Sequence, residues 1–192
     1  MKTLPPGFEA ARAGPSAEQL ELERVRQLVL LGACHQLLES VTKLPSHQLK
    51  QIVREVHGHD SSILTEPYSA DWFASWQPGV HASLFVTLYQ RFVDAVGKED
   101  ADTLIRAHRL YREQLHLIGL TDILSITCAW RLLQLLDSGN MSLAACKHCG
   151  GQFIAQTSDV WADYRCGLCV PPLNSVLFLN PEAAPQITRQ LM

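Results

Sequence analysis

The stretch CKHCGGQFIAQTSDVWADYRCGLC, from Cys146 to Cys169, is the most informative part of this 192-residue chain. Its four cysteines form two CxxC pairs with 16 residues between them, a spacing typical of tetrahedral zinc sites. Two thiolates on one tight turn can bind a single cation, and a short hairpin can bring over a second turn that completes four sulfur ligands. The stretch therefore predicts one zinc ion bound by Cys146, Cys149, Cys166 and Cys169.

The expected metal is structural. Catalytic zinc usually keeps three protein ligands and an open position, whereas four cysteines close the coordination shell. A redox role or a disulfide pair is the competing interpretation, but a redox CxxC normally accompanies a βαβ unit, and none is indicated here. His148, inside the first pair, is not needed as a ligand and is expected at the surface.

Residues 141–172 are predicted to form a small zinc-binding module with short β-strands. Gly150 and Gly151 suit the turn that follows the first cysteine pair. The large apolar side chains expected on strands beside the metal are Phe153, Ile154, Trp161 and Tyr164.

Upstream of the cysteines, apolar residues recur at the three- and four-residue steps of amphipathic helices. A helical domain is predicted over 18–140, with helices at about 18–40, 46–57, 80–96, 100–115 and 121–136. A loop is expected over 57–70, and DWFASWQPG is interpreted as an aromatic cluster around a turn, with Trp72, Phe73 and Trp76 as anchors. Residues 1–17 are expected to be a flexible leader and 173–192 an irregular tail. The predicted fold class is mainly α, a helical domain followed by a small zinc-binding module with four cysteine ligands.

Composition excludes several classes of protein. Apolar residues make up 47% of the chain and charged residues 18%, with a formal net charge of -3, which indicates a folded protein without a global polyanion-binding charge. No stretch has the apolar length of a membrane span or of a signal peptide, so a soluble cytoplasmic protein is expected. Cys34 and Cys128 lie in helical patterns and are expected to be buried thiols.

The helical part offers weaker candidates for function. Residues 35–58 have the outline of a helix-turn-helix, although a plain packing hairpin looks the same in sequence and is the more common case. Arg106, Arg109 and Arg112 could contact phosphate or an acidic partner, or form a solvated helix face. No Ser, Cys or carboxylate stands at a catalytic spacing from a histidine, so no enzyme is predicted.

Several segments together resemble one known family. LVLLGACHQLLES, ADWFASWQPGVHAS, RAHRLYREQ, TCAWRLLQLLDSG and CKHCGGQFI followed by CGLCVPP are similar, in this order, to FlhC, the flagellar transcriptional activator subunit of beta- and gamma-proteobacteria. The resemblance runs from about Glu18 to Pro172.

This resemblance implies a transcription factor that acts in a hetero-oligomer with the small helical protein FlhD, four FlhD chains to two FlhC chains. It implies binding to promoter DNA upstream of flagellar operons, recruitment of RNA polymerase, and a zinc-ligand role for the four cysteines. Lys147 and Arg165 flank the cysteines and are the candidate contacts to DNA phosphates.

One departure from the family keeps an alternative function open. The segment after the last cysteine is usually basic in the family, whereas Arg189 is the only basic residue of 173–192. Phosphate contacts supply much of the affinity for DNA. The alternative is a zinc-containing modulator that binds an FlhD-like partner without gripping DNA.

Overall fold

A computed structural model describes residues 16–58, 68–160 and 163–172. In this part of the chain, seven α-helices precede a two-stranded antiparallel sheet, which confirms the predicted mainly α fold with a small β-containing module. None of the described helices has the length and apolar character needed to cross a membrane. The predicted tail and residues 1–15 of the predicted leader lie outside the described residues.

The first predicted helix is two helices. Helix α1 (Ala17–Leu30) begins at a capping box made by Ser16 and Gln19, and α2 (His35–Val41) follows after a break. The break lies at Gly32, whose φ of 84° is in the left-handed region that favours glycine. Cys34 N–H then donates to Thr127 Oγ1 at 2.9 Å. The prediction of one helix over 18–40 was wrong because the left-handed φ of Gly32 interrupts the helix.

Helix α3 (Ser46–His57) agrees with the prediction. It ends at Gly58, which has a left-handed φ of 74° and whose N–H donates to the Arg54 carbonyl at 2.8 Å. Leu49 and Ile52 are buried against the core. Of the loop predicted over 57–70, residues 59–67 lie outside the described residues.

The aromatic cluster forms two consecutive helices, α4 (Ala70–Ala74) and α5 (Trp76–Val96). The break within this predicted cluster falls at Ser75, between the two helices, whereas Pro78 and Gly79 lie in the first turn of α5. Proline is tolerated there since the first N–H groups of a helix have no intrahelical acceptor. Gly79 is needed for a different reason: a Cβ at this position would lie 2.9 Å from the Phe73 carbonyl oxygen of α4.

Helix α6 (Ala101–Leu117) is close to the predicted range, whereas α7 (Ile126–Asp137) starts five residues later than expected at 121. Residues before α7 are held instead by side chains of α6. His108 Nε2 lies 2.8 Å from the Leu124 carbonyl oxygen, and Leu124 N–H donates to the Tyr111 hydroxyl at 3.3 Å. These tertiary hydrogen bonds keep this segment out of the helix.

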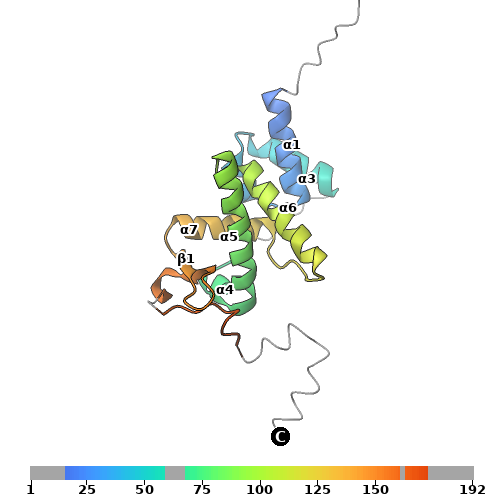
Figure 1. The fold of residues 1–192 in the computed structure, drawn as a ribbon. Coiled ribbons are helices and arrows are strands. Elements are labelled where there is room, and N and C mark those ends of the chain that lie inside the picture. Colours follow the sequence, from blue (N-terminus) through green and yellow to red (C-terminus); the bar gives the residue numbers. More distant parts are fainter. Residues whose placement is uncertain (1–15, 59–67, 161–162, 173–192) are drawn as a thin grey trace, which may run out of the picture.

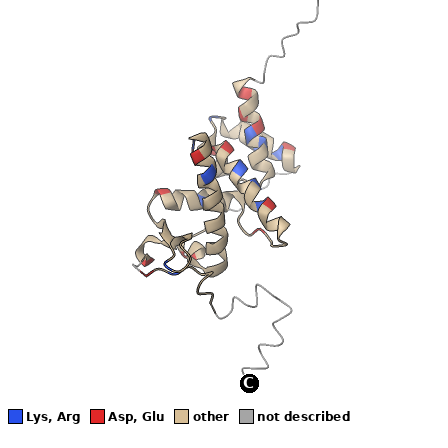
Figure 2. Ribbon diagram, viewed as in Figure 1, with Lys and Arg blue, Asp and Glu red and all other residues tan. Residues whose placement is uncertain are grey.

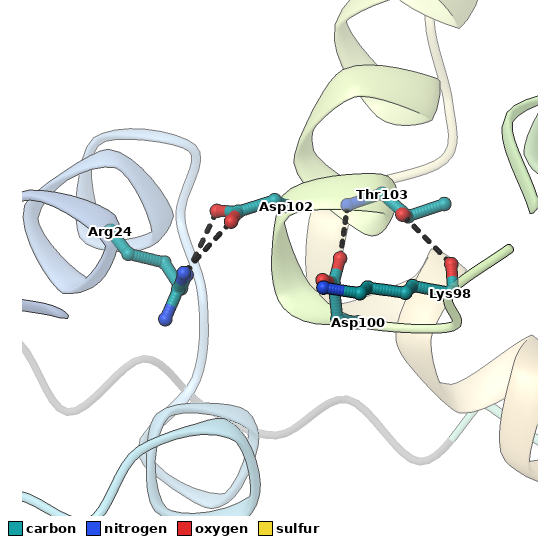
Figure 3. A network of polar contacts seen from close by, with 5 residues as sticks. All are labelled: Arg24, Lys98, Asp100, Asp102 and Thr103. Carbon is teal, nitrogen blue, oxygen red and sulfur yellow. Dashed lines mark hydrogen bonds and ion pairs between the residues drawn. The ribbon is translucent and has the colours of Figure 1, made fainter. Parts of the chain in front are cut away.

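An ion pair joins the first helix to α6 (Figure 3). Arg24 donates to both carboxylate oxygens of Asp102 at 2.8 Å. Beside it, Asp100 caps α6 by accepting from Thr103 N–H, and the Thr103 hydroxyl donates to the Lys98 carbonyl.

Strands β1 (Met141–Ala145) and β2 (Gln152–Gln156) pair with Leu143 opposite Ile154. Strand positions predicted for Phe153 and Ile154 are confirmed. Tyr164 is not in a strand, because its carbonyl accepts a hydrogen bond from Lys147 N–H in the first cysteine turn. Trp161 lies outside the described residues.

Helix α5 is the axis of the molecule (Figure 1). It runs alongside α6 and reaches from the region of α1 and α3 to α4 and the sheet. Its buried Phe85 meets Tyr111 of α6 edge-on, with ring centroids 6.4 Å apart. Cys34 and Cys128 are buried in the same core, as predicted. The cysteine module therefore sits on one end of the longest helix.

Candidate metal centre

The first cysteine turn begins where β1 ends. Cys146 N–H donates to the Gly151 carbonyl at 2.9 Å, and Gly150 N–H donates to the Cys146 carbonyl at 2.8 Å. Gly150 has a left-handed φ of 73°, which closes the turn at low steric cost. The hairpin thereby places Cys146 and Cys149 on the same tight loop.

The second turn is bound to the first through the backbone. Cys169 N–H and Val170 N–H both donate to the Cys166 carbonyl at 3.0 Å, and Lys147 N–H donates to the Tyr164 carbonyl at 2.9 Å. This last bond links the two turns across the module.

These turns bring the four sulfur atoms together. All four lie within 4.8 Å of one another, and the Cys146–Cys169 and Cys149–Cys166 pairs are each 3.8 Å apart. A zinc–sulfur bond of about 2.3 Å in a tetrahedron requires sulfur atoms about 3.8 Å apart. A disulfide would need about 2.05 Å, and the four thiols are free. The arrangement can hold one tetrahedral metal ion.

Electrostatics at the cluster favour one thiolate over the others. Backbone N–H groups of Cys149 and Cys166 lower the pKa of Cys146 to about 6. Burial, together with the neighbouring thiols, raises the pKa of Cys169 to about 12, and burial raises that of Cys166. Four thiolates at this spacing repel one another, so a multivalent cation is what allows all four to be ionised.

Polar contacts attach the module to α4 and α5. Trp76 Nε1–H of α5 donates to the Gly167 carbonyl at 2.8 Å. Ile154 N–H of β2 donates to Ser83 Oγ at 2.9 Å, and Gln156 Nε2 donates to Asp71 Oδ1 at 2.7 Å. Trp76 was predicted to be an anchor, and it is one.

Gly167 has a steric role that the sequence analysis missed. A Cβ at this position would lie 2.7 Å from Trp76 Cδ1, so the indole packs directly on the second cysteine turn. The signal in the sequence was the glycine inside CGLC, but its partner 91 residues away is visible only in the structure.

Lys147, His148 and Arg165 are exposed around the cluster. In the described part of the module, the two cations Lys147 and Arg165 are balanced by Asp159 and Asp163. Most of the other charged residues lie on the helices, where both signs are interspersed (Figure 2). Charge therefore does not single out a DNA-binding face, and the phosphate-contact role of Lys147 and Arg165 stays a prediction.

The weaker candidates of the helical part lie on α2, α3 and α6. Helix α3 packs against α1 and α2 and leaves its polar residues exposed, an arrangement that a packing hairpin and a helix-turn-helix share. Arg112 pairs with Asp122 at 2.6 Å, whereas Arg106 and Arg109 are exposed. His81 is buried and its Nδ1 lies 2.7 Å from the Tyr111 hydroxyl.

Comparison with known proteins identifies the family. The family model described as "Flagellar transcriptional activator (FlhC)" matches residues 15–177. Three relatives share the name "Flagellar transcriptional regulator FlhC". The one from Gallionella capsiferriformans is 39% identical over 156 residues, covering 81% of this chain and 86% of the relative. The one from Cupriavidus metallidurans is 41% identical, with coverages of 79% and 73%. The one from Yersinia enterocolitica is 34% identical, with coverages of 91% and 92%.

These descriptions agree with the resemblance found in the sequence. A transcriptional regulator is not an enzyme, which is consistent with the lack of a catalytic pattern. The chain therefore belongs to the FlhC family of flagellar transcriptional activators.

Proposed function

We propose that this chain is the DNA-binding subunit of a cytoplasmic activator of flagellar operons. It works in a hetero-oligomer with an FlhD-like helical protein, four of those chains to two of this one, and the complex binds promoter DNA and recruits RNA polymerase. The observation that carries the proposal is the family match over residues 15–177. The cysteine cluster at one end of α5 supports it, because a metal-ordered module can present a rigid surface to DNA.

In this proposal the four cysteines hold one structural zinc ion. The 3.8 Å sulfur separations support zinc because they match a tetrahedral thiolate site. Zinc cross-links the two turns, which have few buried apolar side chains of their own. Binding energy at such sites is folding energy, so the metal acts by keeping Lys147 and Arg165 in place.

Lys147 and Arg165 contact DNA phosphates in this proposal. Lys147 lies in the first cysteine turn and Arg165 directly precedes the second, and both side chains are exposed. Cations positioned by a rigid turn fix the register of a protein on the duplex without reading bases.

The test is promoter binding by the co-expressed complex at several salt concentrations. We expect tight binding whose affinity falls steeply as salt rises, because each neutralised phosphate releases counterions. The complex of the Lys147→Ala/Arg165→Ala double variant should bind more weakly. The slope of log affinity against log salt should be shallower by about 1 for each lost contact.

Lys98→Ala is the matched control, because Lys98 is an exposed cation on the loop before α6. It should leave the affinity and the slope unchanged. Equal effects of the control and of the double variant would show that these two residues have no specific role.

The alternative is a modulator that binds the FlhD-like partner but does not bind DNA. The specific observation in its favour is charge: the described part of the module is balanced, and Arg189 is the only basic residue of 173–192. A stable complex that ignores promoter DNA even at low salt would favour this alternative over the activator.

A further inference from the structure

Helix α7 carries more apolar surface than the core requires. Its buried stripe is formed by Cys128, Ala129, Leu132 and Leu135. A second stripe, Trp130 and Leu133 with Gln134 and Asp137, follows the same helical spacing on another face. Trp130 and Leu133 are only half-buried. Both side chains pack against the core and leave part of their apolar surface uncovered.

This second stripe forms one wall of a groove. Two adjoining hollows of about 580 and 430 Å³ lie along it and share Tyr89, Glu99, Leu133 and Asp137 as lining residues. The first is also bounded by the end of α5, and the second by the end of α2 and the start of α6. We call this surface the α5–α7 groove. It has an apolar floor contributed by separate helices.

The rim of the groove is acidic. Asp94, Glu99, Asp100 and Asp137 line it, and no Lys or Arg is found among its described lining residues. The cations next to lining residues in the sequence are Arg91, Lys98 and Arg131, and Arg131 donates to Gln134 Oε1 at 3.0 Å.

Three of the rim carboxylates are available to a partner. Asp100 is engaged as the cap of α6 (Figure 3). Asp94, Glu99 and Asp137 are exposed and make no ion pair with any described residue. Tyr89, at the floor of the groove, is affected by this negative charge. Its burial, together with the charges of Glu99 and Asp100, raises its pKa to about 12.

From this combination we infer that the α5–α7 groove binds an amphipathic helix of a protein partner, with the apolar side of the helix on Trp130 and Leu133 and its Lys or Arg residues at the acidic rim. The rim excludes the other macromolecule of the proposed function, because carboxylates repel DNA phosphates. The groove therefore belongs to the protein-binding side of the molecule. The inference does not rest on zinc or on promoter binding, and it can fail separately from them.

The test uses the purified full chain and two synthetic helical peptides. One peptide is built from Leu and Lys with Leu on one face, and the other has Glu in place of every Lys. We expect the Leu/Lys peptide to bind with an affinity that falls as salt rises, and the Leu/Glu peptide not to bind. Equal binding of the two peptides would overturn the inference.

Groove variants decide whether binding occurs at this surface. Gln90→Lys/Gln134→Lys adds two cations to the groove without removing core side chains, and Asp94→Asn/Glu99→Gln/Asp137→Asn removes the rim charge. Each variant should lower the affinity for the Leu/Lys peptide by about tenfold or more, because several charge pairs between peptide lysines and the rim are weakened or lost together.

Matched controls make the same charge changes elsewhere. These are Gln48→Lys/Gln51→Lys on α3 and Glu18→Gln/Glu23→Gln/Glu113→Gln on α1 and α6, all at exposed positions. They should leave peptide affinity within about twofold of the unmodified chain. Equal weakening by groove and control variants would overturn the inference, as would a dimer of the chain that the groove variants dissociate.

Discussion

Gly167 shows how a single missing side chain positions the cysteine module. The Trp76 indole lies over the second cysteine turn and donates to the Gly167 carbonyl. Any β-carbon at this position would overlap the ring, at 2.7 Å from Cδ1. The hydrogen bond and the close approach occur at the same residue, so one change affects both.

Gly167→Ala should therefore loosen the module. We expect a loss of about 1–3 kcal/mol in the free energy of unfolding, because the ring or the turn must move, together with a change in tryptophan fluorescence. Leu168→Ala is the control: that side chain is 57% exposed, and its removal should cost less than about 0.5 kcal/mol. Unchanged stability in Gly167→Ala would mean that the indole does not pack on this turn.

The Arg24–Asp102 pair makes stability depend on pH in a defined direction. The hydrogen bond from Arg24 holds the pKa of Asp102 below its usual value of 3.8. A carboxyl whose pKa is lowered by folding stabilises the protein above its unfolded-state pKa. That stabilisation is lost as pH falls through the folded-state pKa.

Asp102→Asn should then be less stable than the unmodified chain at pH 7. The two side chains are 31% and 45% exposed, so solvent screening limits the expected loss to about 0.5–1 kcal/mol. The difference between the two proteins should stay constant down to about pH 5 and shrink in more acidic solution. Urea unfolding across this range measures it. Arg24→Ala leaves Asp102 in the first turn of α6 and should reproduce most of the loss at pH 7. If the stability difference between Asp102→Asn and the unmodified chain instead widens toward acid, the Arg24–Asp102 pair is not its source.

At the scale of elements, sequence patterns predicted what is local and missed what is tertiary. Apolar spacing located α3, α6 and the C-terminal end of α5. The break after α1 was missed because apolar spacing continues on both sides of Gly32, whereas the structure shows the left-handed φ of Gly32 and the hydrogen bond from Cys34 N–H to Thr127 Oγ1. The late start of α7 depends on the Leu124 contacts with α6. The cysteine turns were predictable from spacing, whereas their attachment to α5 was not.

Ser83 is the residue through which α5 holds β2. Its hydroxyl donates to the Gly79 carbonyl and accepts from Ile154 N–H. Ser83→Ala should leave this buried N–H without an acceptor and destabilise the protein by about 1–3 kcal/mol. Amide hydrogen exchange should also quicken at Ile154.

Thr87→Val is the matched control, because it removes a hydroxyl whose described hydrogen bond is to the Ser83 carbonyl within the same helix. Its cost should be smaller, and exchange at Ile154 should not change. If both variants behave alike, the bond from strand to helix contributes nothing measurable.

The whole molecule consists of a helical body and a cysteine module, and one binding surface is proposed on each. The body has its own buried core and should fold without metal. The module has a two-stranded sheet and little core, so its order depends on the cation and on α5. We propose that the module binds DNA. We infer that the α5–α7 groove binds a cationic helix of a protein partner.

Metal dependence of the module is measured by the zinc content of the purified full chain before and after chelation, with circular dichroism recorded on the same samples. We expect one zinc ion per chain from the four-cysteine cluster. Its removal should disorder the module but leave most of the helical signal, and Cys149→Ser should retain less metal than Cys34→Ser. If a chain purified under reducing conditions holds no zinc, or keeps an ordered module after chelation, then zinc does not hold this module together.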